Sequence, residues 1–243
     1  MFRKRYKRRF KRKRSTKRRY GRKRYARRRY RLSRMRPGNR KDTETVKLRY
    51  AYSTVVSHPG PGGGVWYFPT FRANSIFDPH WEIAPTDTTA FDYARFSDRY
   101  NKYIVLGSKI KYTLLRGNGD IVSHVFMTKL DDDGQSFNLG DKLYRWYADP
   151  TVRKQHFNLN SNMRSQLVAT RYYSPRKFFG FKDTRDNFAR HGAAVDANPA
   201  ETVCFCAGMQ AADLQQETPF TITLIVEIDY LVQFREPKDY IFS

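Results

Sequence analysis

The sequence predicts an all-β domain behind a basic N-terminal arm, and three observations lead to this prediction. The whole net charge of +24 lies in the first 41 residues. The rest of the chain alternates apolar and polar residues in short runs bounded by turn residues, as half-buried strands do. The strand, helix, strand rhythm of a parallel α/β sheet is missing. We therefore expect an eight-stranded antiparallel jelly roll, or a similar two-sheet β-sandwich, with long loops.

The N-terminal arm, residues 1–41, is defined by its charge. It contains 24 Lys and Arg and no acidic residue, so the other residues contain 47 minus 24, or 23, basic residues against 23 acidic ones. A segment with so little aliphatic surface and so much self-repulsion cannot offset the entropy cost of folding alone. We expect residues 1–41 to be disordered and residues 42–243 to form one domain.

The basic residues of the arm favour nucleic acid as the partner. A guanidinium group binds phosphate oxygens bidentately, and each contact releases condensed counterions. Nuclear import can use the same residues. The residues predicted to bind nucleic acid and import receptors are Arg3, Lys4, Arg5, Lys7, Arg8, Arg9, Lys11, Arg12, Lys13, Arg14, Lys17, Arg18, Arg19, Arg22, Lys23, Arg24, Arg27, Arg28, Arg29, Arg31, Arg34 and Arg36.

Aromatic residues alternate with these charges and indicate a single-stranded partner, DNA or RNA. Unpaired bases stack on aromatic rings, whereas a duplex exposes few base faces. The residues predicted to stack on bases are Phe2, Tyr6, Phe10, Tyr20, Tyr25 and Tyr30. Two other interpretations are a tail that serves nuclear import alone and an amphipathic helix on a membrane. The membrane-bound helix is disfavoured because the aromatic spacing changes from four to five and Gly21 interrupts the pattern, so that no continuous apolar face forms.

The domain is expected to begin near Thr43, after the hinge-like sequence Arg36-Pro37-Gly38-Asn39. Alternation then predicts eight strands, at 45–56, 64–76, 102–116, 120–130, 165–173, 176–181, 201–210 and 219–234. The Asn118-Gly119 pair predicts a hairpin that makes the third and fourth strands antiparallel neighbours. Short helices are expected within 89–103 and 141–150.

The sequence contains no motif of a catalytic or cofactor site. Asp131-Asp132-Asp133-Gly134 begins like a calcium loop but lacks the distal Glu, so we interpret it as an acidic loop. Cys204 and Cys206 have no second pair, and the five histidines are scattered, which argues against zinc. The glycine-rich run 59–64 lacks the Gly-Lys-Ser/Thr of a phosphate loop. We expect no enzyme, no metal and no cofactor.

No membrane partner is expected either. The most apolar stretch, residues 219–234, is interrupted by Glu227 and Asp229 and is too short to cross a bilayer. The two cysteines lie one residue apart in a predicted strand, which disfavours a disulfide between them. A reducing compartment fits this pattern.

Two short segments of the domain are distinctive: Val232-Gln233-Phe234-Arg235-Glu236, followed by Lys238-Asp239, and Arg171-Tyr172-Tyr173-Ser174-Pro175. The first is similar to the end of the last strand in capsid proteins of circoviruses and cycloviruses. The second resembles the Arg-aromatic-aromatic-Ser/Thr-Pro segment of the same family. The basic arm, the strand order and the total length also agree. The third predicted strand departs from some relatives, since residues 111–115 lack their Trp and Cys, and residues 77–101 match no known pattern of the family.

The resemblance implies a jelly-roll subunit of a T=1 icosahedral shell around circular single-stranded DNA. It implies that the arm faces inward and serves nuclear import, so that the protein occurs in the virion and the host nucleus. The partners would be the DNA genome, or RNA, further copies of the chain, import receptors and an unknown host attachment factor. Aromatic residues such as Trp66 and Trp81 would then lie either in the domain core or between subunits.

Two alternatives remain open at this stage. A cellular nucleic-acid-binding protein of ribosomal type would place a basic patch on the folded domain as well as on the tail. The balance of 23 basic and 23 acidic residues in the domain argues against it without excluding a patch. An enzyme acting on nucleic acid would need an acid and base pair or a metal cluster that the sequence does not reveal.

Overall fold

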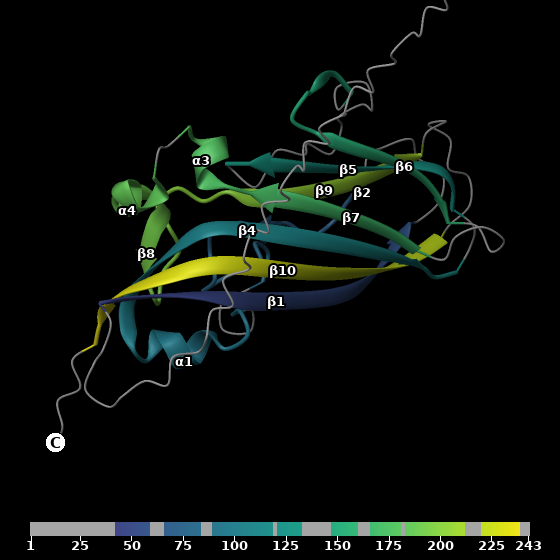
Figure 1. Ribbon diagram of the computed structural model, residues 1–243. Helices are drawn as coiled ribbons and strands as arrows, with labels where there is room; N and C mark the ends of the chain where they lie inside the picture. The colour runs from purple at the N-terminus through teal and green to yellow at the C-terminus, as the bar shows by residue number, and fades with distance from the viewer. Residues whose placement is uncertain are drawn as a thin grey trace, which may run out of the picture. The chain divides into compact units, whose positions relative to one another are not determined.

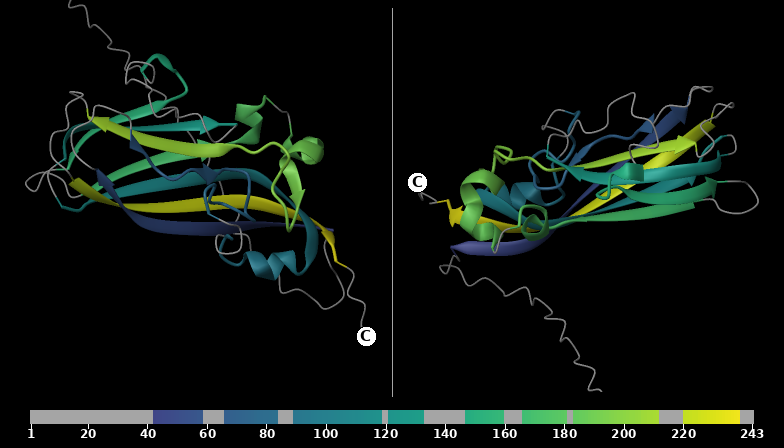
Figure 2. Two further views of the ribbon diagram at one scale, coloured as in Figure 1. Left: turned by 180° about the vertical axis from the view of Figure 1, so that it is seen from behind. Right: turned by 90° about the horizontal axis from the view of Figure 1, so that it is seen from above.

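The computed structural model describes residues 42–58, 66–83, 89–118, 121–132, 147–159, 166–180, 183–211 and 220–238. These residues form two antiparallel sheets of five strands each, stacked as two layers (Figures 1 and 2). The predicted arm, residues 1–41, lies outside the described residues. Its disorder and its role therefore stay predictions.

Sheet A contains four long strands in the order β1-β10-β4-β7, with a short fifth strand, β8, that pairs with β4. All its pairings are antiparallel. The strands are β1 (Thr43–His58), β10 (Phe220–Pro237), β4 (Tyr100–Arg116), β7 (Gln166–Tyr173) and β8 (Gly192–Ala194).

Sheet B has the order β2-β9-β5-β6, and the short strand β3 also pairs with β9. Its pairings are antiparallel as well. The strands are β2 (Trp66–Tyr67), β3 (Phe71–Arg72), β5 (Ile121–Asp131), β6 (Arg153–Leu159) and β9 (Cys204–Ala211).

The order in which the chain visits the two sheets identifies the fold as a jelly roll. It passes from β1 in sheet A to β2 and β3 in sheet B, returns to β4, crosses to β5 and β6, returns to β7 and β8, crosses to β9 and ends at β10. Sheets β1-β10-β4-β7 and β2-β9-β5-β6 are the two halves of an eight-stranded jelly roll. The predicted fold class is confirmed.

The period-two pattern of β10, an inner strand of sheet A, shows that one of its faces is buried. Its alternate residues from Phe220 to Tyr230 are buried, and the residues between them are partly exposed. The buried set belongs to one continuous core between the sheets, which includes Tyr112 from sheet A and Phe126 from sheet B in an edge-to-face contact. Burial of this face fixes the register of the long strands.

Strand β9 is buried along its whole length. A second cluster of Val125, Met127 and Val152, with Tyr67 packed against it, accompanies the main core in this sheet. Cys204 and Cys206 occupy alternate positions of β9, are buried and form no disulfide. They behave as small apolar residues in a strand.

Three local predictions were wrong. The segment 64–76, predicted as one strand, contains the two short strands β2 and β3. Residues 175–178 form helix α3 (Pro175–Phe178) and not a strand, because Pro175 fits the first helical turn and cannot donate to a ladder. The third and fourth predicted strands, β4 and β5, lie in opposite sheets and do not pair. Near this connection, the backbone N–H of Gly117 donates to the carbonyl of Thr221 at 3.0 Å, so the end of β4 is tied to β10.

Strands β6 and β8 were not predicted. Helix α1 (Tyr93–Ser97) lies within the predicted segment 89–103, but Tyr100 and the residues after it already belong to β4. Of the segment 141–150, only residues 147–150 are described. The turn elements η2 (Thr184–Asn187) and α4 (Phe188–His191) precede β8. Across the described ranges, no helix has the length and apolar character needed to span a membrane.

Candidate nucleic-acid interface

The residues predicted to bind nucleic acid all lie in segment 1–41, outside the described residues. The structure therefore brings none of them together and tests none of them. The outer face of sheet A is the candidate basic and aromatic surface of the folded domain, because the alternate residues on this face are not needed for the core.

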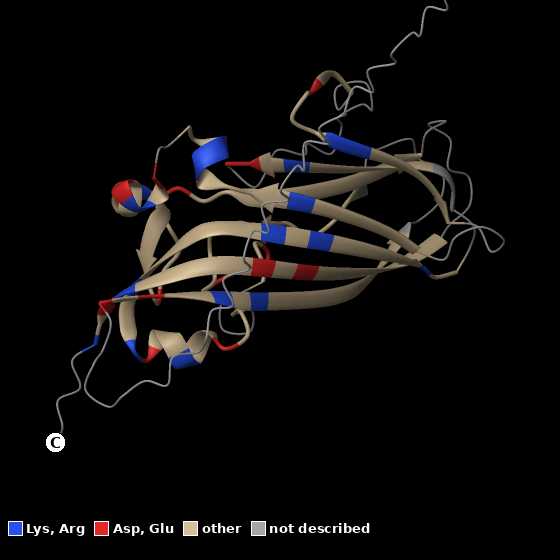
Figure 3. Ribbon diagram, in the orientation of Figure 1, with Lys and Arg blue, Asp and Glu red and all other residues tan. Residues whose placement is uncertain are grey.

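Cross-strand register arranges charged side chains in two rows on this face. Arg49 of β1 lies opposite Asp229 of β10, which lies opposite Lys109 of β4. In the next row, Glu227 of β10 lies opposite Lys111 of β4. Figure 3 shows the acidic positions on β10 between basic positions on β1 and β4.

Most of these charges are paired. The Nε atom of Arg49 donates to Asp229 Oδ1 at 2.7 Å, and Lys111 Nζ lies 2.6 Å from Glu227 Oε2. The hydrogen bond that Arg49 donates to Asp229, together with the negative charge of Asp229, raises the pKa of Arg49. These pairs are exposed, so each contributes little to the stability of the fold. Arg49 and Lys111 are therefore largely neutralised by β10.

Lys109 and Tyr172 are different, because no carboxylate in the described part of the chain lies within 4 Å of Lys109 Nζ. The two residues are direct cross-strand neighbours on β4 and β7. Lys109 Nζ lies 5.4 Å from the ring centroid of Tyr172, and this tyrosine is 59% exposed. An exposed aromatic face beside an unpaired cation suits an unpaired base and its phosphate.

Two arginines extend the positive surface to the edge of the sandwich, where β6 and β7 lie in different sheets. Arg153 Nη1 of β6 donates to the carbonyl of Thr170 at 3.3 Å, and Arg171 Nη2 of β7 donates to the carbonyl of Thr151 at 2.7 Å. Desolvation lowers the pKa of Arg171, and the positive charge of Arg153 lowers it further. Each arginine donates to a backbone carbonyl, which is neutral, so these hydrogen bonds do not cancel the positive charge of either guanidinium group.

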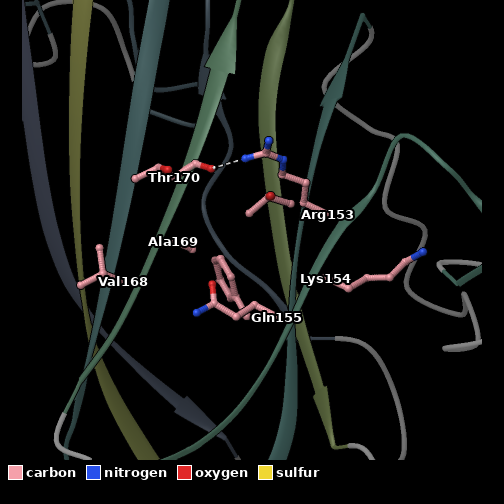
Figure 4. Close-up of a pocket in the computed structure, with 8 residues that line it drawn as sticks. Arg153, Lys154, Gln155, Val168, Ala169 and Thr170 are labelled. Atoms are coloured by element: carbon pink, nitrogen blue, oxygen red, sulfur yellow. Dashed lines mark hydrogen bonds between the residues drawn. The ribbon is translucent and has the colours of Figure 1, made fainter. Parts of the chain in front are cut away.

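A groove of about 430 Å³ lies beside these arginines, between β5 and β6 on one side and β7 on the other (Figure 4). Its lining combines apolar side chains with polar ones: Phe126, Val168, Ala169, Thr128, Thr170, Arg153, Lys154 and Gln155. In Figure 4, Arg153 reaches toward Thr170 on the opposite strand, whereas Lys154 points away from it. The groove is present because the edge strands β6 and β7 do not pair with each other.

We define the β4–β7–β6 surface as Lys109 and Tyr172 on the outer face of sheet A together with Arg153 and Arg171 at the adjoining edge. Arg171 is half-buried and lies on the other side of β7 from Tyr172, because consecutive strand residues point to opposite faces. Figure 3 shows basic positions on these three strands. Sequence reasoning did not assign these residues to a site. Arg171 and Tyr172 lie in the segment noted for its family resemblance, but the proximity of Lys109 follows only from the register of β4 and β7. A patch of this kind is what a nucleic-acid-binding domain requires.

Comparison with known proteins gives likenesses of fold at low identity. No protein-family model matches the chain, and no curated protein is significantly similar to it. Among solved structures, the 60-mer BFDV capsid protein is 10% identical, with a TM-score of 0.44 over 84% of this chain and 99% of that chain. The structure of Mud crab tombus-like virus is 14% identical, with a TM-score of 0.40 over 85% of this chain and 96% of that chain. The structure of Desmodium yellow mottle tymovirus is 8% identical, with a TM-score of 0.34 over 86% of this chain and 97% of that chain. Because these values are low, the jelly roll is assigned from strand order and register alone.

No metal centre is visible in the folded part that the structure describes, where no group of three or more His, Cys, Asp or Glu side chains could hold an ion. Asp131 ends β5 and is paired with Lys129, whose Nζ lies 2.7 Å from Asp131 Oδ2. Asp133 and Gly134 of the acidic loop lie outside the described residues. His124 is buried in β5 with its ring edge-to-face with Phe220.

Proposed function

We propose that this chain is a viral capsid protein. Its jelly-roll domain assembles into a small T=1 icosahedral shell, and its arginine-rich arm packages circular single-stranded DNA. The observation that carries the proposal is the division of charge: a segment with 24 basic and no acidic residues precedes a jelly-roll domain with 23 of each sign. Many such arms on one shell can neutralise one polyanion, and the polyanion in turn screens repulsion between the arms.

The β4–β7–β6 surface supports the same function from the folded side. Lys109 and Tyr172 offer one cation and one exposed ring on a sheet face, which gives a packaged strand a second, ordered contact. Arg171 and Tyr172 also belong to the segment that resembles the circovirus and cyclovirus family. The proposal further includes import of the chain into the host nucleus through the arm and attachment to a host factor of unknown nature.

A second candidate is a cellular nucleic-acid-binding protein of ribosomal type. The basic positions on β4, β6 and β7 favour it, because such a protein needs a patch on its folded domain (Figure 3). The two candidates differ in self-association: a shell subunit forms large closed particles, whereas a binding module stays small on its nucleic acid.

Replacement of Tyr172 with Ala tests the nucleic-acid role of the folded domain. We expect the full-length variant to bind a fluorescent single-stranded oligonucleotide about fivefold more weakly or worse, because one stacked base is lost. Lys109→Ala is expected to weaken binding and to reduce the slope of log K against log salt by about one. Fluorescence anisotropy over a salt series measures both effects.

The matched control is Val55→Ala, since Val55 is 64% exposed and belongs to β1, the strand at the other edge of sheet A. Duplex DNA of the same length provides a second comparison, because it exposes few base faces. Equal affinities of Tyr172→Ala, Val55→Ala and the unmodified chain for the single strand would remove Tyr172 from the interface.

A further inference from the structure

The most exposed large apolar side chain in the described part of the domain is Phe91, which is 76% exposed. Its backbone is nevertheless fixed. The N–H of Phe91 donates to the carbonyl of Arg49 on β1 at 2.7 Å, and the N–H of Ala90 donates to the carbonyl of Ile76 at 3.1 Å. Ala90 is buried, so the chain is anchored on the N-terminal side of the ring.

The residue that follows is held in an unusual conformation. Asp92 has a φ of 63°, in the left-handed region that costs free energy for a residue other than glycine. The next residue, Tyr93, is buried as the first residue of α1. Packing on both sides thus keeps Phe91 outward on a rigid backbone. An aromatic ring presented in this way loses little conformational entropy when a partner covers it.

The groove between β6 and β7 offers a complementary surface on the same chain. Phe126, Val168 and Ala169 contribute the apolar part of a lining that also contains polar and charged residues, and its volume of about 430 Å³ exceeds that of one aromatic ring. Val168 is 42% exposed, so apolar surface is open to solvent at the groove. Burial of an aromatic side chain against such a lining is a common source of binding energy at protein interfaces.

The charges beside the two surfaces have opposite signs. Asp92, next to Phe91, is exposed and forms no ion pair with a described residue. Arg153, at the groove, is exposed and also has no carboxylate within 4 Å among the described residues; its recorded hydrogen bond is the one to Thr170. If Phe91 entered the groove of another molecule, Asp92 could approach Arg153. Complementary charges of this kind favour one orientation of the partners.

The positions of the two surfaces determine the type of contact. Phe91 forms a β-bridge with Arg49 of β1, whereas the groove borders β7. Strands β1 and β7 are at opposite ends of the four long strands of sheet A. The surfaces lie on different parts of the subunit, so a contact between them is head-to-tail and repeats from copy to copy, closing into a ring when the rotation allows. Such a contact would use Arg153 of the β4–β7–β6 surface and would leave Lys109 and Tyr172 for nucleic acid.

From these observations, we propose that Phe91 of one copy of this chain docks into the groove between β6 and β7 of a second copy, with Asp92 opposite Arg153. The proposal rests on the proposed function, because it presupposes that the chain self-associates. It adds the two surfaces that join neighbouring subunits.

Disulfide trapping in the full-length protein tests the contact. We expect Phe91→Cys combined with Val168→Cys to give covalent dimers and higher oligomers on a non-reducing gel after mild oxidation, since a disulfide forms only between close residues. The native Cys204 and Cys206 are buried and remain in place. The control pair is Phe91→Cys with Val55→Cys, which places the second cysteine on an exposed residue away from the groove. Equal cross-linking in both pairs, or none in either, overturns the proposal.

A second variant separates this proposal from the proposed function. Phe91→Ala should raise the protein concentration needed for assembly by about tenfold or more, because a central aromatic anchor is lost. Val55→Ala should leave it unchanged. If Phe91→Ala assembles like the unmodified chain, the docking contact is wrong while the capsid role stands. If the unmodified chain does not self-associate at any concentration tested, the capsid role and the contact are both wrong.

Discussion

Deletion of residues 1–41 is expected to reduce the affinity for single-stranded DNA by about a thousandfold or more near physiological salt. The segment contains 24 of the 47 basic residues and no acidic one. If half of these groups contact phosphates, the slope of log K against log salt is about −8 for the full chain. The deletion variant should retain a slope of only about −1 to −2 from the three basic residues of the β4–β7–β6 surface. Anisotropy of a labelled oligonucleotide over a salt series measures both slopes.

A charge-preserving variant is the matched control for this deletion. Replacement of Phe2, Tyr6, Phe10, Tyr20, Tyr25 and Tyr30 with Ser keeps every basic residue of the arm. The salt slope should stay near that of the full chain, while the preference for single strands over duplex falls, because about 1 to 3 kcal/mol is lost for each stacked base. If the deletion variant, folded by circular dichroism, binds within tenfold of the full chain, the arm is not the main binding element.

Replacement of Asp78 with Asn is expected to destabilise the domain by about 3 kcal/mol. Asp78 Oδ2 lies 2.6 Å from Arg72 Nη1, and the two side chains are only 6% and 11% exposed. Nη1 of Arg72 also donates to the backbone carbonyls of Asp78 and His80. Removal of the carboxylate charge leaves the guanidinium charge buried without a compensating anion, which is far more costly than the loss of a surface pair. Urea unfolding followed by circular dichroism measures the change.

The matched control is Asp229→Asn in the exposed pair with Arg49. The side chains of this pair are 47% and 58% exposed, so water replaces the lost interaction and the change in stability should be much smaller than for Asp78→Asn. Equal effects of the two substitutions would mean that the buried pair near β3 contributes no more than a surface pair.

The long strands could be predicted because one face of each is buried. In β10, alternation persists from Phe220 to Tyr230, and the register with β1 and β4 keeps that face in the core. Strand β6, with the sequence RKQHFNL, was missed since only Phe157 and Leu159 are buried in this edge strand. The apolar run at 176–181 predicts a strand, but a run this short has no periodicity that distinguishes a strand from a short helix.

The pairing of strands was harder to predict than their positions. The Asn118-Gly119 sequence is a hairpin signal, but β4 continues in sheet A beside β10 while β5 pairs with β9 in sheet B. Long-range burial of both strands decides their partners, and a local turn signal contains no information about it. The same limit applies to the β4–β7–β6 surface, where Lys109 and Tyr172 meet only through sheet register.

Sedimentation velocity of the purified full-length protein near physiological salt, with absorbance recorded at 260 and 280 nm across the same boundary, tests the capsid proposal most directly. We expect one fast, homogeneous boundary rich in absorbance at 260 nm, because the arms of many subunits gather nucleic acid into a closed particle. A slow boundary of monomers or small oligomers, with or without bound nucleic acid, would contradict the capsid role and favour a nucleic-acid-binding module.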